Sequence, residues 1–250
     1  MLESNLKRAS DIVARANRIL VFAGSGLSQE SGIPTFRGEE GIYADDKLLE
    51  FAHVGALEEQ PEEALKWYQE FRSRFDQYEP NPGHYALARL AKLGEMLVAT
   101  QNVDGLLQKA FRREGTAPNI WNLHGTLDRI VCHKCGEVIE NEPDDLSKDY
   151  EHTCGGVLRP DVVLFGEMLP EKPFEEALKA AERADVVLML GTSGLVYPAA
   201  SIPTLARSHG AKLIEINPNE TELSHAAEIV LRGKTGEVLP KLDRLVHQRR

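Results

Sequence analysis

The sequence predicts an α/β fold, in which an open parallel sheet carries helices on both faces. Short apolar runs alternate with segments of helical spacing along most of the 250 residues. The runs are rich in Val, Ile and Leu, as expected for strands buried on both faces. Glycine or polar residues directly follow three of them, at 23–28, 101–104 and 191–193. Ligands bind beyond such strand ends in open α/β sheets, so a Rossmann-like fold is expected.

The first half of the chain contains three expected strands and one insertion. Helical spacing predicts a leading helix at 3–17, and an apolar run predicts the first strand at 19–22. Residues 37–80 are charged and helix-prone, and their aromatic side chains recur on one helical face. This pattern predicts packing within a small helical lobe. The elements that follow are a helix at 84–93, a strand at 96–100, a helix ending near 113 and a strand at 120–123.

The second half begins with a segment of different character. Residues 128–160 contain all three cysteines, an acidic run and the pair Gly155-Gly156, which indicates a small inserted module. The expected elements after it are an extended segment at 162–165, helices at 173–183, 198–208 and 236–247, and strands at 186–190, 213–216 and 229–231.

One domain over residues 1–250 is therefore expected to have three parts. The Rossmann-like core takes about 1–36, 84–127 and 161–250, the helical lobe 37–83 and the zinc-ribbon-like module 128–160. The length is sufficient for one large core with a smaller lobe.

Composition excludes several classes of protein. The net charge is 29 − 39 = −10, which argues against a nucleic-acid duplex as partner. No apolar run is long enough to cross a bilayer, and the polar start lacks a signal-peptide core, so a cytoplasmic protein without a membrane partner is expected. Three cysteines are too few for a disulfide scaffold.

The first strand runs directly into a glycine turn. Gly24 and Gly26 allow a backbone turn to approach a ligand closely, and Ser28, Glu30 and Ser31 are suited to opening a helix. Strand, glycine turn and helix start form a phosphate-binding layout, although Gly-x-Gly alone also fits an ordinary tight turn.

Two further strand ends have residues suited to chemistry. Gln101, Asn102 and Asp104 follow a buried strand, where amides orient a ribose or carboxamide and a carboxylate binds hydroxyls. The alternative is that Asn102 and Asp104 cap the next helix. His124 stands at a strand end before Gly125, where an imidazole is suited to accept protons near neutral pH. Its rival is His84.

These strings together resemble the sirtuins, the NAD-dependent protein-lysine deacylases. The resemblance rests on 24–37, Gln101-Asn102-Val103-Asp104 and Leu123-His124-Gly125, and it extends over about 17–239. Ser25 stands where the family usually has Ala. The resemblance implies His124, Asn102 and Asp104 as catalytic residues. It implies NAD contacts from Gly24, Ser25, Gly26, Ser28, Phe36, Arg37, Gln101, Asn102, Asp104, Gly191, Thr192, Ser193, Asn217 and Thr235.

The resemblance also implies the reaction and its partner. An acyl-lysine oxygen of a protein substrate attacks the ribose carbon that carries nicotinamide, and His124 takes a proton from a ribose hydroxyl. The acyl group leaves on ADP-ribose, Phe36 shields the reacting face and Arg37 lies near the phosphates or ribose. Residues 162–167 resemble the strand that pairs with the substrate peptide, which implies contacts from Val163, Phe165, Gly166 and Glu167.

The cysteine module departs from the family pattern. Cys132 and Cys135 form a zinc knuckle, but the family's second Cys-x-x-Cys reads Glu151-His152-Thr153-Cys154 here. Zinc held by Cys132, Cys135, Cys154 and His152 is expected, with Glu151 as the other candidate for the fourth ligand. The alternative is a decayed site held together by packing.

The resemblance leaves open which acyl group is removed from lysine. Sirtuins that remove succinyl, malonyl or glutaryl groups have Tyr-x-x-Arg in the helical lobe, whereas here Tyr68 is followed by Phe71 and then Arg72. Tyr68 and Arg72 are candidate substrate contacts. The shift by one residue rotates the cation by about 100° on a helix, so Arg72 either reaches an acyl carboxylate or points to solvent. A deacetylase or general deacylase is therefore favoured over a desuccinylase or demalonylase.

Other functions fit parts of the pattern. The same site would serve an NAD glycohydrolase or an ADP-ribosyltransferase, but the peptide-strand motif at 162–167 argues against both. Asn102, Asp104 and His124 argue against a non-catalytic NAD-binding module. A dehydrogenase would need a ribose-binding acid about 20 residues after the glycine turn, where this chain resembles a cofactor loop.

Overall fold

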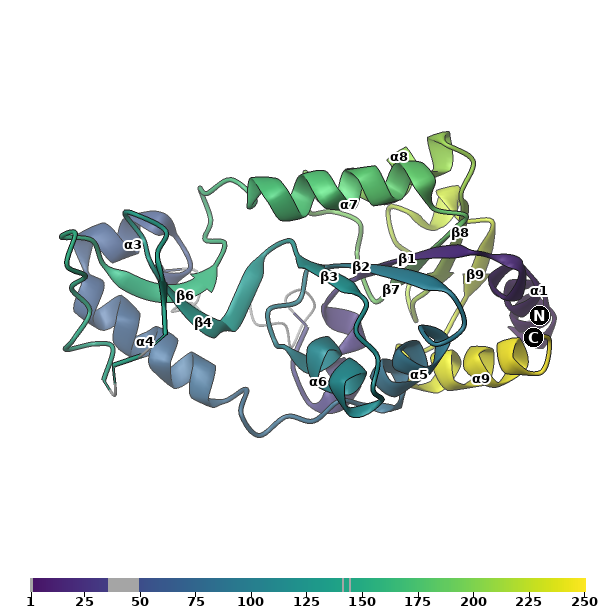
Figure 1. Cartoon of the computed structure of the whole chain (residues 1–250), viewed down its shortest axis with the longest axis horizontal. Coiled ribbons are helices and arrows are strands. Elements are labelled where there is room, and N and C mark those ends of the chain that lie inside the picture. The colour runs from purple at the N-terminus through teal and green to yellow at the C-terminus, as the bar shows by residue number, and fades with distance from the viewer. Residues whose placement is uncertain (1, 36–49, 141, 144) are drawn as a thin grey trace.

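The computed structural model describes residues 2–35, 50–140, 142–143 and 145–250, which form a larger and a smaller lobe (Figure 1). The larger lobe contains a six-stranded sheet in the order β3-β2-β1-β7-β8-β9, with every neighbouring pair parallel. Its strands are β1 (Arg18–Ala23), β2 (Glu95–Thr100), β3 (Asn119–Asn122), β7 (Val186–Leu190), β8 (Lys212–Ile216) and β9 (Ile229–Leu231). The predicted Rossmann-like open sheet is confirmed.

Helices cover both faces of this sheet (Figure 1). One face packs against α1 (Leu2–Arg15), α5 (Pro82–Leu90), α6 (Leu106–Arg113) and α9 (Thr235–His247), and the other against α7 (Glu171–Arg183) and α8 (Ser201–Ser208). Successive side chains of a strand point to opposite faces. In β1, Ile19 and Val21 accordingly belong to the first layer, and Leu20 and Phe22 to the second.

The order in which strands are added reverses between β1 and β7. These two strands are parallel neighbours, although most of the chain separates them. β2 and β3 extend the sheet from one side of β1, and β8 and β9 extend it from β7. Ligands of such sheets bind at the carboxyl ends of the strands, beside the point where the strand order reverses.

The smaller lobe combines the two insertions. It contains the helices α3 (Val54–Glu59) and α4 (Pro61–Ser73) and an antiparallel sheet of β5 (Val138–Ile139), β4 (Gly125–Cys132) and β6 (Leu158–Val162). A single hydrophobic cluster joins residues of α4, such as Leu65 and Trp67, to Ile130 and Leu158 of the sheet. The helical lobe and the cysteine module thus share one core.

The segment after β1 differs from its expected structure. Ser28, Glu30 and Ser31 were suited to opening a helix, but this expectation is wrong. Residues Ser25–Leu27 and Gln29–Ser31 form two short 3₁₀ turns without a side-chain cap. Tertiary contacts occupy these side chains instead, because the Ser28 hydroxyl donates to Asp104 and a Glu30 carboxylate oxygen accepts from the Gly236 N–H.

In the described part of the chain, no helix is both long and apolar enough to cross a membrane.

Candidate active site

A cavity of about 1210 Å³ lies at the carboxyl ends of β1 and β7 and is lined by residues of both lobes. Most of the expected site residues line it: Gly24, Ser25, Gly26, Tyr68, Gln101, Asn102, His124, Val163, Phe165, Gly166, Glu167, Gly191, Thr192, Ser193 and Asn217. Ser28, Arg72, Asp104 and Thr235 do not belong to this lining. Phe36 and Arg37 lie outside the described residues.

The glycines after β1 and β7 bring two loops into backbone contact. The Gly24 N–H donates to the Leu190 carbonyl and the Gly26 N–H to the Gly191 carbonyl, both at 2.9 Å. A Cβ on Gly26 would lie 2.7 Å from the Gly191 Cα, which leaves no space for a side chain. Glycine is therefore required for the packing of these loops, and their backbone forms a wall of the cavity.

The end of β2 contributes a buried amide pair. The Gln101 Nε2 donates to the Thr192 hydroxyl at 3.0 Å, and the Asn102 Nδ2 donates to the Gly24 carbonyl at 3.1 Å. The Oδ1 of Asn102 is buried, and no described residue donates a hydrogen bond to it. A buried acceptor without a donor is costly, and Asn102 is one of the residues that line the cavity.

Asp104 does not line the cavity, but it contacts residues that form its wall. Its Oδ2 accepts from the Ser28 hydroxyl at 2.6 Å, and Ser28 Oγ in turn lies 3.3 Å from the Asn102 Nδ2. Its Oδ1 accepts from the Leu106 N–H at 2.9 Å, as the helix-capping alternative suggested. Burial raises the pKa of Asp104 above its ordinary value, opposed by these hydrogen bonds.

His84 belongs to the core and does not line the cavity. Its Nδ1 accepts from the Asn81 N–H at 3.2 Å in the capping box of α5, and its side chain is fully buried. Burial lowers the pKa of His84 to about 3. This imidazole therefore stays neutral and serves the start of the helix.

His124 does line the cavity, at the junction between β3 and β4. Its Nδ1 lies 3.1 Å from the Gln101 carbonyl, and burial lowers its pKa below the ordinary value, opposed by this bond. At neutral pH the ring is therefore uncharged. A carbonyl only accepts, so the proton is on Nδ1 and Nε2 has a lone pair available for a proton. Gly125, at φ +78°, allows the sharp turn into β4.

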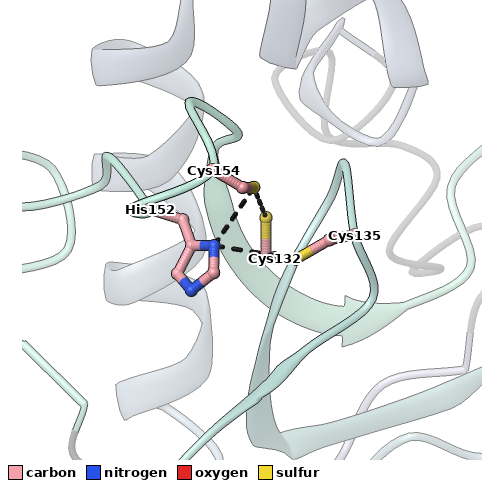
Figure 2. Close-up of side chains that lie close together, drawn as sticks. All are labelled: Cys132, Cys135, His152 and Cys154. Carbon is pink, nitrogen blue, oxygen red and sulfur yellow. Dashed lines mark hydrogen bonds between the residues drawn. The ribbon is translucent and has the colours of Figure 1, made fainter.

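Three thiols and one imidazole meet in the smaller lobe (Figure 2). The ligand atoms of Cys132, Cys135, His152 and Cys154 all lie within 4.8 Å of one another. The His152 Nδ1 approaches two of the sulfurs, at 3.1 Å from Cys154 and 3.6 Å from Cys135. Its Nε2 lies 3.5 Å from a Glu137 carboxylate oxygen, the arrangement that orients metal-binding histidines. This donor set is compatible with tetrahedral zinc, and Glu151 is not part of it.

Comparisons with known proteins agree with this geometry. A sequence profile of the Sir2 family matches residues 24–198. NAD-dependent protein deacylase 2 of Pyrobaculum aerophilum is 41% identical over 242 residues, which are 96% of this chain and 95% of that protein. The chain belongs to the Sir2 family. The Sir2 homology covers the glycine turn, the β2 and β3 ends and the cysteine module in one continuous match.

Solved Sir2 structures share the fold. A Sir2 homolog in complex with NAD superimposes with a TM-score of 0.86 at 39% identity, covering 97% of this chain and 94% of that one. Sir2Af2 bound to a myristoylated histone peptide gives a TM-score of 0.74 at 30% identity, covering 99% and 98%.

One part of the Sir2 cavity is aromatic. Trp67, Tyr68 and Phe71 of α4 line it together with Leu127 and Leu164. Arg72, the next residue, instead forms a two-point ion pair with Glu142, at 2.6 and 3.1 Å. Tyr68 and Arg72 were both candidate substrate contacts, but only Tyr68 lines the cavity.

Arg159 supports the site, although it is not among the residues expected from the sequence. Arg159 of β6 donates to the Glu167 carboxylate at 2.7 Å and to the Val162 carbonyl at 2.6 Å. An arginine next to proline in Leu158-Arg159-Pro160-Asp161 has no distinctive spacing, and only the pairing of β6 with β4 places it there.

Proposed function

We propose that this Sir2-family chain is an NAD-dependent protein-lysine deacylase, which cleaves NAD to nicotinamide and transfers the acyl group to ADP-ribose. One observation carries the proposal: His124 with its neutral imidazole, the amide residue Asn102 and the backbone segment 163–166 all line one cavity. A proton acceptor, a nucleotide wall and a segment for a peptide are thus adjacent. The relatives support it, since one is named a deacylase, one binds NAD and one binds an acylated peptide.

The contacts of each residue suggest its role. NAD, when bound, supplies the ribose carbon that accepts the acyl oxygen. Asn102 and Gln101 orient the nicotinamide end, and the loops at Gly24–Gly26 and 191–193 receive the phosphates and adenosine with Asn217. Nε2 of His124 takes the hydroxyl proton that must leave during acyl transfer.

Two residues act from behind the cavity wall. Asp104 holds Ser28, which accepts from the amide of Asn102. The Thr235 hydroxyl donates to the Gly26 carbonyl at 3.2 Å and thereby fixes the glycine turn. We assign both residues to orientation of the cofactor wall.

We also propose that neutral acyl groups are preferred over succinyl or malonyl groups. An acidic acyl chain needs a cation or strong donors near its carboxylate. The Tyr68 hydroxyl already donates to the Phe51 carbonyl at 2.9 Å, Phe71 occupies the wall, and Arg72 is paired with Glu142. The aromatic wall therefore favours an apolar chain.

Nicotinamide release with NAD and an acetyl-lysine peptide tests the function. We expect release that depends on the peptide and appears together with deacetylated peptide and acetylated ADP-ribose. Release without peptide would instead indicate an NAD glycohydrolase, and transfer of labelled ADP-ribose to protein would indicate an ADP-ribosyltransferase. A succinyl-lysine peptide of the same sequence, turned over faster than the acetyl peptide, would refute the acyl preference.

A further inference from the structure

We infer that Arg159 is a positioning residue, which fixes the segment 162–167 in the conformation that receives the substrate peptide. The inference rests on the proposed deacylase function and adds a residue outside the cavity lining. Arg159 lies in β6, after the last cysteine of the module and shortly before the predicted peptide segment. Its effect on the substrate is therefore indirect, through the residues that it contacts.

The guanidinium of Arg159 joins two groups of this segment. Nη1 donates to the Val162 carbonyl at 2.6 Å, and Nη2 donates to a Glu167 carboxylate oxygen at 2.7 Å. Only 11% of the Arg159 side chain and 17% of the Glu167 side chain are exposed. Water and salt screen such a pair little, so both bonds constrain the geometry more than a surface pair would.

Glu167 transmits this constraint back into the segment. Its second carboxylate oxygen accepts from the Leu164 N–H at 2.8 Å, and its own N–H donates to the Leu164 carbonyl at 3.0 Å. One carboxylate oxygen is thus bonded to Arg159 and the other to the segment itself. We therefore assign Glu167, which the sequence analysis placed among the peptide contacts, to positioning together with Arg159.

The same arrangement leaves backbone groups available for a peptide. The Val163 N–H donates to the His124 carbonyl at 3.0 Å, and the Phe165 N–H donates to the Ala52 carbonyl at 2.8 Å. Among the described residues, neither the N–H nor the C=O of Gly166 has a hydrogen-bond partner, although Gly166 lines the cavity. Groups of this kind bind an added strand, and their direction depends on the turn that Glu167 closes.

Lysine does not replace arginine in this role. The planar fork of arginine reaches a carbonyl and a carboxylate at once, whereas an ammonium is a single point on a flexible stem. Removing the guanidinium leaves the nearly buried Glu167 carboxylate with the Leu164 N–H and, at 3.7 Å, the His133 Nδ1 as its remaining neighbours. The carboxylate would then attract water, and the turn at Leu164 would loosen.

The test compares Arg159→Met, Arg159→Lys and Glu167→Gln with the wild type. Binding of a fluorescein-labelled acetyl-lysine peptide is measured by anisotropy, and KM is measured separately for peptide and NAD. We expect Arg159→Met and Glu167→Gln to raise the peptide Kd and KM about tenfold, with Arg159→Lys in between. KM for NAD and kcat should stay within about twofold, because the cofactor wall is untouched.

Arg129→Gln is the matched control. Arg129 pairs with Asp161 across the same small sheet, but half of its side chain is exposed and it does not line the cavity. Its loss should change the peptide KM less than about twofold.

Two results would overturn the inference: peptide affinity of folded variants close to that of the wild type, or an equal rise of the peptide and NAD KM values. If Arg159→Met does not fold, as circular dichroism would show, Glu167→Gln and Arg159→Lys decide. Failure of the proposed function looks different, because the wild type itself would then release no nicotinamide in response to peptide.

Discussion

Two histidines at element ends have opposite surroundings in this chain. His84 is enclosed by the start of α5 and accepts from a backbone N–H, so its proton acceptor is already used. His124 lines the cavity and uses its Nδ1 for the Gln101 carbonyl, which leaves Nε2 for chemistry. Burial lowers the pKa of both rings, but only one of them meets substrate. Exposure to the cavity, not the pKa, separates the two residues.

We expect His124→Ala to lower kcat by about 10²- to 10⁴-fold, because the proton acceptor is lost. The fold should persist, as thermal unfolding would verify. His209→Ala, at an exposed histidine directly after α8, is the control and should retain full activity. Turnover of His124→Ala at the wild-type rate would show that another group is the base.

The pH profile provides a second check on His124. Its pKa lies below the ordinary 6.5, and the neutral ring is the active form. Activity should therefore stay high as pH falls through 6.5 and decline only below it. An acid limb of kcat/KM centred above pH 6.5 would contradict the burial of this imidazole.

Phe71→Arg should introduce a cation into the aromatic wall. A charge-assisted bond to a substrate carboxylate would raise kcat/KM for a succinyl-lysine peptide relative to its acetyl counterpart about tenfold. Phe75→Arg is the control, because Phe75 lies one turn further along and outside the cavity lining. An unchanged ratio in Phe71→Arg would mean that the acyl chain does not reach this wall.

At the scale of elements, the loops after β1 and β7 depend on each other. Gly26→Ala would place a methyl group 2.8 Å from the Gly191 carbonyl oxygen, a backbone atom that has no rotamer to change. We expect a loss of about 1–3 kcal/mol in the free energy of unfolding, together with weaker NAD binding by calorimetry. In the control Gly55→Ala, the added Cβ would lie 3.5 Å from the His53 Nδ1, an ordinary contact, and the position is helical. That control should be at least as stable as the wild type.

The predictable and unpredictable elements differ in the range of their contacts. Strands such as β1 and β7 follow from apolar runs, and polar residues that come after them line the cavity. The helix expected after Gly26 does not form, because packing against Gly191 outweighs the local capping residues. β4 and the role of Arg159 depend on pairing with distant residues, which no local period reveals.

At the scale of the whole molecule, the metal site should stabilise the smaller lobe. We expect about one zinc ion per chain by elemental analysis, and His152→Ala should lose zinc and lower the Tm. His152→Cys should retain zinc, since it gives the cluster a fourth thiolate. Glu151→Ala is the control and should bind zinc normally, because Glu151 lies outside the cluster. Folded, active wild-type protein without zinc would refute the site.

The shared core of the smaller lobe has a consequence for engineering and for divergence within the family. Trp67 and Tyr68 belong to the cavity wall and also to the cluster that contains Cys132 and Leu158. A change of side-chain volume in this wall is therefore felt at the metal module, more than 60 residues further along the chain. If α4 were replaced by the equivalent helix of another Sir2 protein, its new side chains would pack against β4 and β6 residues that had not been changed with it. To change the acyl selectivity, the helical lobe and the cysteine module should therefore be replaced together.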